Sequence, residues 1–208
     1  INFNHPALRA PLLSKEGTGG GNPSITVHPG MFYSDFEKET LAQGLLLPSY
    51  PASKNLCAIG GMVANNSGGE KTLKYGKTED YVISLKIILS DGNEYLVKSL
   101  TKNELHQKIN QNDFEGNVYK KIWNLIENNR EKIKKAKPNV SKNSAGYYIW
   151  NVEQADGKFD LNKILVGSQG TLGIVTEVTF KLVPIPKESK LAIIYLDNIK
   201  KISDLTAE

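Results

Sequence analysis

The chain has 208 residues, of which 39% are hydrophobic and 23% are charged, and its formal net charge is +4. This composition excludes a disordered chain, and the length allows one large or two small globular domains. No apolar run approaches the roughly 18 residues that a membrane-spanning helix needs, so we expect no transmembrane segment. The one cysteine, Cys57, excludes an internal disulfide and favours a reducing compartment.

The expected elements follow from the hydrophobic period and from turn residues. Strands are predicted over 25–28, 81–89, 94–97 and 176–183, with a further strand over 190–196. Helices are predicted over 34–43, from near Gly61, and over 102–110, 115–136, 161–166 and 198–207. Ser90-Asp-Gly-Asn93 predicts a hairpin turn between the second and third strands. Because strands and helices do not alternate regularly, the predicted fold class is α+β.

Basic residues concentrate at 130–137, which reads Arg-Glu-Lys-Ile-Lys-Lys-Ala-Lys. Such a run can bind nucleic acid. It also suits the last turns of a helix, where cations offset the negative end of the macrodipole before Pro138 stops the helix. Apolar residues upstream fall on one helical face. We therefore expect a helix packed on the domain and no nucleic-acid partner.

Two glycine-rich stretches carry the strongest functional signal. The first stretch, Ile59-Gly-Gly-Met-Val-Ala-Asn-Asn-Ser-Gly-Gly69, continues to Tyr75-Gly76. The second stretch is Gly167-Ser-Gln-Gly-Thr-Leu-Gly-Ile-Val175. Glycines among small residues let backbone N–H groups approach a bulky anion where a Cβ would collide. The pattern favours a dinucleotide ligand.

Two commoner nucleotide motifs do not fit. A Rossmann fingerprint in Gly17-Thr-Gly-Gly-Gly21 would need a preceding strand and a glycine at position 22, which is Asn22. A Walker A loop ending in Gly76-Lys77 would need a glycine where Lys71 stands. The cluster from Gly17 to Gly21 is interpreted as a flexible connection.

The residues resemble the FAD-binding domain of the FAD-linked oxidases, of the vanillyl-alcohol oxidase (PCMH) and D-lactate/glycolate dehydrogenase type. The resemblance covers 25–187 and mainly the second subdomain of that fold. Residues 1–24 are an unassigned connection or a remnant of the first FAD subdomain, and 188–208 resemble the start of a substrate domain. The matching motifs are Val27-His-Pro-Gly30, Pro51-Ala-Ser53, Ile59-Gly-Gly61, Asn65-Asn-Ser-Gly-Gly69, Tyr75-Gly76, Ser90-Asp-Gly92 and Gly167 to Ile174.

The resemblance implies FAD as cofactor and divides the cofactor-binding residues into two groups. Those implied on the flavin and pyrophosphate side are Pro51, Ser53, Gly60, Gly61, Asn65, Ser67, Gly68 and Gly69. Those implied on the adenosine side are Gly170, Gly173, Ile174 and Val175. Some flavoproteins of this fold attach FAD through a cysteine, but Leu56-Cys-Ala-Ile-Gly-Gly61 resembles the non-covalent type, so we expect non-covalent FAD.

The chain departs from the family pattern at several places. The family's first glycine-rich pyrophosphate loop should precede the strand at Val27, and residues 1–24 do not supply it. Ala58 replaces a frequent threonine, Gln169 a frequent glutamate and Tyr148 a frequent asparagine. The missing loop raises the question of whether this chain alone retains FAD.

The resemblance implies an oxidoreductase that moves a hydride from a small 2-hydroxy acid to flavin N5, with an unknown electron acceptor. Binding such an acid calls for an arginine for its carboxylate and a histidine for its hydroxyl proton. The arginines and histidines lie outside the glycine-rich stretches, so the catalytic residues stay unknown and are expected elsewhere; no metal-ligand spacing is present. The candidates of these two types are Arg9, Arg130, His5, His28 and His106.

Two other functions stay open from the sequence. One is an inactive remnant of the FAD domain that serves as a binding scaffold. The other is an enolpyruvyl sugar-nucleotide reductase of the same fold, although its protonating serine motif is not evident. The expected location is the cytoplasm, with peripheral attachment to a membrane as the other option.

Overall fold

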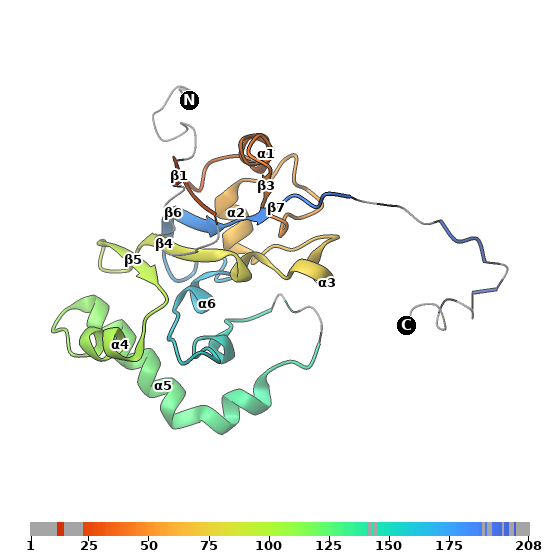
Figure 1. Ribbon diagram of the computed structural model, residues 1–208. Coiled ribbons are helices and arrows are strands. Elements are labelled where there is room, and N and C mark those ends of the chain that lie inside the picture. Colours follow the sequence, from red (N-terminus) through yellow and green to blue (C-terminus); the bar gives the residue numbers. More distant parts are fainter. Residues whose placement is uncertain are drawn as a thin grey trace.

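A computed structural model describes residues 12–14, 23–140, 143, 145–188, 190, 193–196, 198–199 and 202 (Figure 1). Within these residues the centre is a five-stranded sheet in the order β1-β2-β6-β4-β5, in which every neighbouring pair is antiparallel. Its strands are β1 (Leu12–Ser14), β2 (Ser24–Val27), β4 (Val82–Ile88), β5 (Glu94–Lys98) and β6 (Ile174–Lys181). A smaller sheet pairs β3 (Leu45–Leu46) with β7 (Val183–Pro184).

The central strand β6 pairs with β2 on one side and β4 on the other, so that buried side chains of the three strands lie next to one another. Ile25 of β2 pairs with Phe180, and Leu85 of β4 pairs with Val178, and all four side chains are fully buried. Alternate residues of a strand point to opposite faces, so this register collects the apolar side chains on one face. The ring of Phe180 meets Phe36 of α1 edge to face, with centroids 6.2 Å apart.

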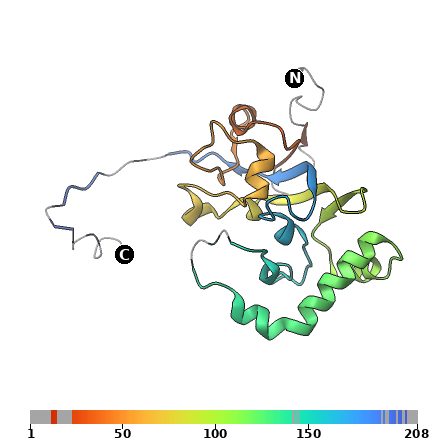
Figure 2. The same ribbon diagram turned by 180° about the vertical axis from the view of Figure 1, so that it is seen from behind.

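Helices lie on opposite sides of the sheet, with α1 on one side and α5 on the other in both views (Figures 1 and 2). The α-helices are α1 (Tyr33–Leu41), α2 (Ile59–Ala64), α3 (Thr72–Tyr75), α4 (Lys102–Ile109), α5 (Phe114–Ala136) and α6 (Asn162–Leu165), and the 3-10 helices are η2 (Thr78–Asp80) and η3 (Ile149–Asn151). None of the helices in the described part of the chain is long and apolar enough to cross a bilayer.

The long helix α5 bends at Asn129, whose backbone angles are not helical (φ −133°, ψ 19°). The guanidinium of the next residue, Arg130, binds the carboxylates of Glu127 and Glu153. Ile133 packs against the core, while Lys134 and Lys135 are exposed. The basic run therefore ends a packed helix, as the sequence predicts, although the bend was not expected.

The α+β class is confirmed, and most expected elements form within about two residues of their predicted ends. The strand expected over 190–196 is wrong for its described residues, because Lys190 and 193–196 are not in a strand. The strand β1 and the short α3 were not predicted. The Gly17–Gly21 cluster lies outside the described residues, as does most of the helix expected over 198–207.

Candidate functional site

The structure brings the two glycine-rich stretches together at the C-terminal end of α2. The N–H of Gly167 donates to the carbonyl of Val63, and the N–H of Gln169 donates to the carbonyl of Ala64, each at 2.9 Å. Gly167 has a φ of +88°, and a Cβ there would lie 3.2 Å from the Cβ of Asn66. The second stretch is thus bonded directly to the helix that the first stretch forms.

A cavity of about 240 Å³ opens between the two stretches. Most of its lining is apolar or bare backbone, which suits a flat aromatic ring better than a charged group. Five of the predicted cofactor residues line it: Gly60, Gly170, Gly173, Ile174 and Val175. Pro29, Ala64, Leu165 and Ser168 also line it, and sequence reasoning did not assign them.

Several of the glycines are required by packing within the protein. A Cβ at Gly60 would lie 2.7 Å from the Cβ of Pro29, and a Cβ at Gly173 would lie 2.6 Å from the carbonyl oxygen of Ile88. At Gly69 the same atom would lie 2.4 Å from the carbonyl oxygen of Tyr50. These three glycines therefore let backbone segments approach closely, whether or not a ligand binds.

Gly61 is different because nothing in the described part of the chain requires a glycine there. It lies within α2, it is exposed, and no atom lies within 4 Å of the position that a Cβ would take. Its N–H has no hydrogen-bond partner in the described part of the chain, whereas those of Ile59 and Gly60 donate to Met31 and Pro29. The first N–H groups of a helix have no acceptor within it, so this N–H and the open space beside it are available to a ligand.

Comparison with known proteins identifies the domain. Residues 20–97 match the sequence model of the family described as FAD binding domain. The chain contains an FAD-binding domain of the FAD-linked oxidases. This confirms the family that the chain resembles and FAD, the cofactor that the resemblance implies.

The relatives of this FAD-binding domain are longer proteins. The chain is 31% identical to the glycolate oxidase subunit GlcD of Bacillus subtilis over 190 residues, which is 89% of this chain and 30% of the relative. It is 29% identical to the D-lactate dehydrogenase of Anaerostipes hadrus over 176 residues, or 85% of this chain and 26% of the relative. A solved structure of alkyldihydroxyacetonephosphate synthase aligns with a TM-score of 0.46 and 20% identity over 79% of this chain and 22% of that one. The chain spans less than a third of the length of these relatives.

Buried polar atoms without partners lie within the first stretch and just after it. Asn66 is nearly fully buried and has a φ of +47°; its Oδ1 accepts from the N–H of Glu79 at 3.0 Å, but its Nδ2 has no partner among the described residues. The Oγ1 of Thr72 is also buried without a partner. Unpaired buried donors and acceptors are costly, and in the described part of the chain Ser49, Ser99 and Asn162 also hold such an atom, so these groups are not confined to the glycine-rich stretches. Sequence reasoning missed both residues, although the Asn65-Asn66 pair was a signal.

The other predicted residues on the flavin side lie in the turn after Tyr50 and at the end of the first stretch. The carbonyl of Pro51 accepts from Lys54, and the carbonyl of Ser53 accepts from Cys57, at 3.0 and 3.1 Å. Ser53 and Asn65 are exposed. The carbonyl of Ser67 accepts from both the N–H and the hydroxyl of Thr78, so Ser67 anchors the loop through its backbone.

Gly68 packs against side chains at the back of this loop. A Cβ there would lie 2.5 Å from the Oγ1 of Thr72 and 3.2 Å from the Cγ of Lys77. The Lys77 side chain is buried, and its ammonium binds the carbonyl of Asn143, the hydroxyl of Tyr148 at 2.5 Å and a carboxylate oxygen of Glu79 at 3.6 Å. A buried polar cluster therefore supports the first stretch from behind.

Cys57 lies beside the start of α2 and is partly buried. Burial raises the pKa of its thiol, and its Sγ lies 3.8 Å from the carbonyl of Lys54. A thiol with a raised pKa holds less of the reactive thiolate at neutral pH. This environment agrees with the expectation of non-covalent FAD.

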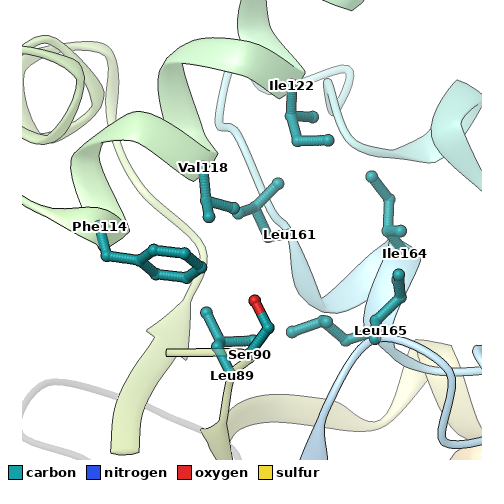
Figure 3. Close-up of a pocket in the computed structure, with 9 residues that line it drawn as sticks. Leu89, Ser90, Phe114, Val118, Ile122, Leu161, Ile164 and Leu165 are labelled. Carbon is teal, nitrogen blue, oxygen red and sulfur yellow. The ribbon is translucent and has the colours of Figure 1, made fainter. Parts of the chain in front are cut away.

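A second cavity, of about 190 Å³, lies between α5 and α6 (Figure 3). Its side chains point inward from both helices and from the end of β4, and all are apolar except Ser90. Leu165 lines this cavity as well as the cavity between the glycine-rich stretches. Because the lining of the cavity between α5 and α6 offers one hydroxyl and no charge, this cavity does not suit a pyrophosphate.

Neither of the described histidines, nor the described arginine, lines the cavity between the two glycine-rich stretches. His28 is exposed and its Nδ1 lies 3.2 Å from the carbonyl of Thr176. Arg130 is occupied by Glu127 and Glu153, and His106 lines a separate polar cavity beside it. The described residues also hold no group of three or more side chains that could bind a metal ion.

Proposed function

We propose that this chain holds the FAD of an oxidoreductase that oxidises a small 2-hydroxy acid. The observation that carries the proposal is the cavity that both glycine-rich stretches line, next to the free N–H and open surface of Gly61. Bound FAD would accept a hydride from the carbon that bears the substrate hydroxyl. The curated relatives named above, a glycolate oxidase subunit and a D-lactate dehydrogenase, support the class of substrate.

Different residues of this chain would bind the adenine, the pyrophosphate and the flavin ring of FAD. The apolar cavity with Ile174 and Val175 suits the adenine ring, since it offers a flat surface with backbone groups at its edge. The N–H of Gly61 would donate to the pyrophosphate, because no side chain blocks its approach. The turn at Pro51 and Ser53 would then lie against the flavin ring.

The chemical step needs groups that this site does not supply. His28, His106 and Arg130 all lie outside the residues that we assign to FAD. We therefore assign the positioning of the flavin to this chain. The base that removes the proton of the substrate hydroxyl is none of these three residues. The electron acceptor stays open.

The test is an absorbance spectrum of the full-length protein, purified from cells supplied with riboflavin, before and after acid precipitation. We expect flavin bands that pass into the supernatant as free FAD. Colour that stays in the pellet would contradict non-covalent binding and would implicate Cys57. A colourless full-length protein that also fails to bind added FAD would overturn the oxidoreductase and favour a binding scaffold.

Activity is tested on the same preparation. We expect a small 2-hydroxy acid, offered as D-lactate, glycolate or D-2-hydroxyglutarate, to bleach the flavin band under anaerobic conditions. The Gly61→Ala variant is the matched control, because it should keep the fold and lose the cofactor. A flavoprotein that none of these acids reduces would overturn the substrate class and leave the FAD site standing.

A further inference from the structure

A third cavity lies beside the turn that we assign to the flavin. Its volume is about 550 Å³, and we call it the lysine cavity. Its walls come from α1, β3, α3 and the residues that follow β7. Its lining includes the side chains of Glu37, Tyr50, Lys54, Glu70, Lys71 and Lys74. Figure 1 shows α3 and β7 on the side where the chain leaves the sheet.

The lysine cavity adjoins the proposed flavin site at three points in the sequence. Tyr50 precedes Pro51, Lys54 follows Ser53, and Glu70 follows Gly69, while Tyr50, Lys54 and Glu70 all line the cavity. The close approach of Gly69 to the carbonyl of Tyr50 joins these segments in space. A molecule in the lysine cavity would therefore lie against the loops that we assign to the flavin.

Three of the six charged side chains that line the lysine cavity have an oppositely charged partner among the described residues. The Nζ of Lys54 lies 2.9 and 3.0 Å from the carboxylate oxygens of Glu37. The hydroxyl of Tyr50 donates to Glu70 at 2.9 Å, and Glu188 lies 3.7 Å from the ammonium of Lys190. Glu37 and Glu188 thus lie beside lysines, whereas Glu70 keeps its negative charge, because its partner is the neutral hydroxyl of Tyr50.

Two lysines of the cavity keep an unpaired positive charge. In the described part of the chain, neither Lys71 nor Lys74 has a carboxylate within 4.0 Å. Their ammonium groups instead lie over aromatic rings, that of Lys71 5.4 Å from the centroid of Tyr50 and that of Lys74 5.1 Å from the centroid of Tyr75. Such contacts hold a cation in place while leaving its N–H donors for an anion.

We propose that Lys71 and Lys74 bind the carboxylate of the 2-hydroxy acid substrate, in the lysine cavity next to the flavin. This inference rests on the proposed function. The cavity is large enough for a small acid, and the apolar Leu41, Leu46 and Ile185 line it beside the lysines. Two lysines supply charge without the bidentate geometry of an arginine, so the site accepts the carboxylate from more than one direction.

The experiment uses the full-length flavoprotein with Lys71→Gln, Lys74→Gln and the double variant. Removing a charged hydrogen bond made equally to bound substrate and transition state raises KM about 10-fold and leaves kcat within about 2-fold. We expect this result for each single variant with the best hydroxy acid. Arginine at either position should restore much of the affinity, because it keeps the charge. Lys120→Gln, an exposed α5 lysine with no carboxylate partner among the described residues, is the matched control and should leave KM unchanged.

The outcomes separate this inference from the proposed function. An unchanged KM in the double variant, with flavin content and turnover intact, would overturn the lysine site and leave the function standing. Loss of flavin absorbance in the variants would also overturn it, because the lysines would then serve the cofactor or the fold. A wild-type flavoprotein that no 2-hydroxy acid reduces would overturn both.

Discussion

Two adjacent glycines of α2, Gly60 and Gly61, have opposite surroundings. Gly60 faces Pro29, while Gly61 faces open space. Gly61→Ala should stabilise the FAD-free protein by about 0.5–1 kcal/mol, because alanine is the better helix former. The same change should weaken FAD binding, because its methyl group occupies the approach to the Gly61 N–H.

The matched variant is Gly60→Ala, whose methyl group would meet the Cβ of Pro29 at 2.7 Å. It should lower the free energy of unfolding of the FAD-free protein by about 1–3 kcal/mol, as overpacking does. Urea unfolding and FAD titration measure both quantities. Equal effects of the two substitutions on stability would contradict the distinction between the two glycines.

Lys77 and Glu79 form a buried ion pair behind the first glycine-rich stretch. Lys77→Met should cost about 3 kcal/mol of stability, because it leaves the Glu79 carboxylate buried without its cation. The double variant Lys77→Met/Glu79→Gln should be more stable than Lys77→Met alone, since the amide needs no counter-charge and can still accept from Asn151. Chemical denaturation of the three proteins measures this, and a double variant no more stable than the single one would refute the idea of a stranded charge.

At the scale of elements, the cap of α4 makes stability depend on pH. Glu104 accepts hydrogen bonds from the N–H and the hydroxyl of Thr101, each at 2.8 Å, and lies 3.3 Å from the ammonium of Lys98. These contacts, the Thr101 N–H first, lower the pKa of Glu104 from 4.5 to about 2. A carboxyl group with a lowered pKa in the folded state stabilises the fold above its unfolded pKa, and this stabilisation is lost as the pH falls towards about 2.

The measurement is the difference in free energy of unfolding between the wild type and Glu104→Gln. Glutamine can keep the reciprocal cap of the helix but cannot ionise. We expect the wild-type advantage to be full above pH 5 and to shrink as the pH falls from 4.5 to about 2. Comparing the two proteins cancels the other titrating groups, so a difference independent of pH would show that the charge has no such role.

At the scale of the whole molecule, FAD should act as a folding ligand. Its proposed site joins segments about a hundred residues apart, and binding to the folded state alone stabilises that state. At a free FAD concentration 100 times Kd, this stabilisation is about 2.7 kcal/mol, which corresponds to a rise in Tm of about 5–10 °C for a domain of this size. Differential scanning calorimetry of the protein with and without FAD measures the shift. Gly61→Ala should reduce the shift, and a Tm indifferent to FAD would argue against the site.

Much of the fold could be predicted because local signals and tertiary packing agree. The β-branched run before Ser90 and the turn that follows it predict the β4–β5 hairpin, and the apolar face upstream of Arg130 predicts α5. The strand expected over 190–196 shows the limit of this reasoning, because an apolar β-branched run forms a strand only where a neighbour supplies the ladder of hydrogen bonds. The described residues of that segment have no such neighbour.

The sequence by itself determined the fold class and the two glycine-rich stretches, which predict a dinucleotide because residue type fixes where backbone can approach a ligand, and its family resemblance implied FAD. Only the tertiary structure decided which glycines serve packing and which leave room for a ligand. It also placed Lys71 and Lys74 together at one cavity and left the buried Nδ2 of Asn66 without a partner among the described residues. Those properties depend on which atoms surround each residue in the folded chain, as when Pro29 faces Gly60 and Tyr50 faces both Gly69 and Lys71.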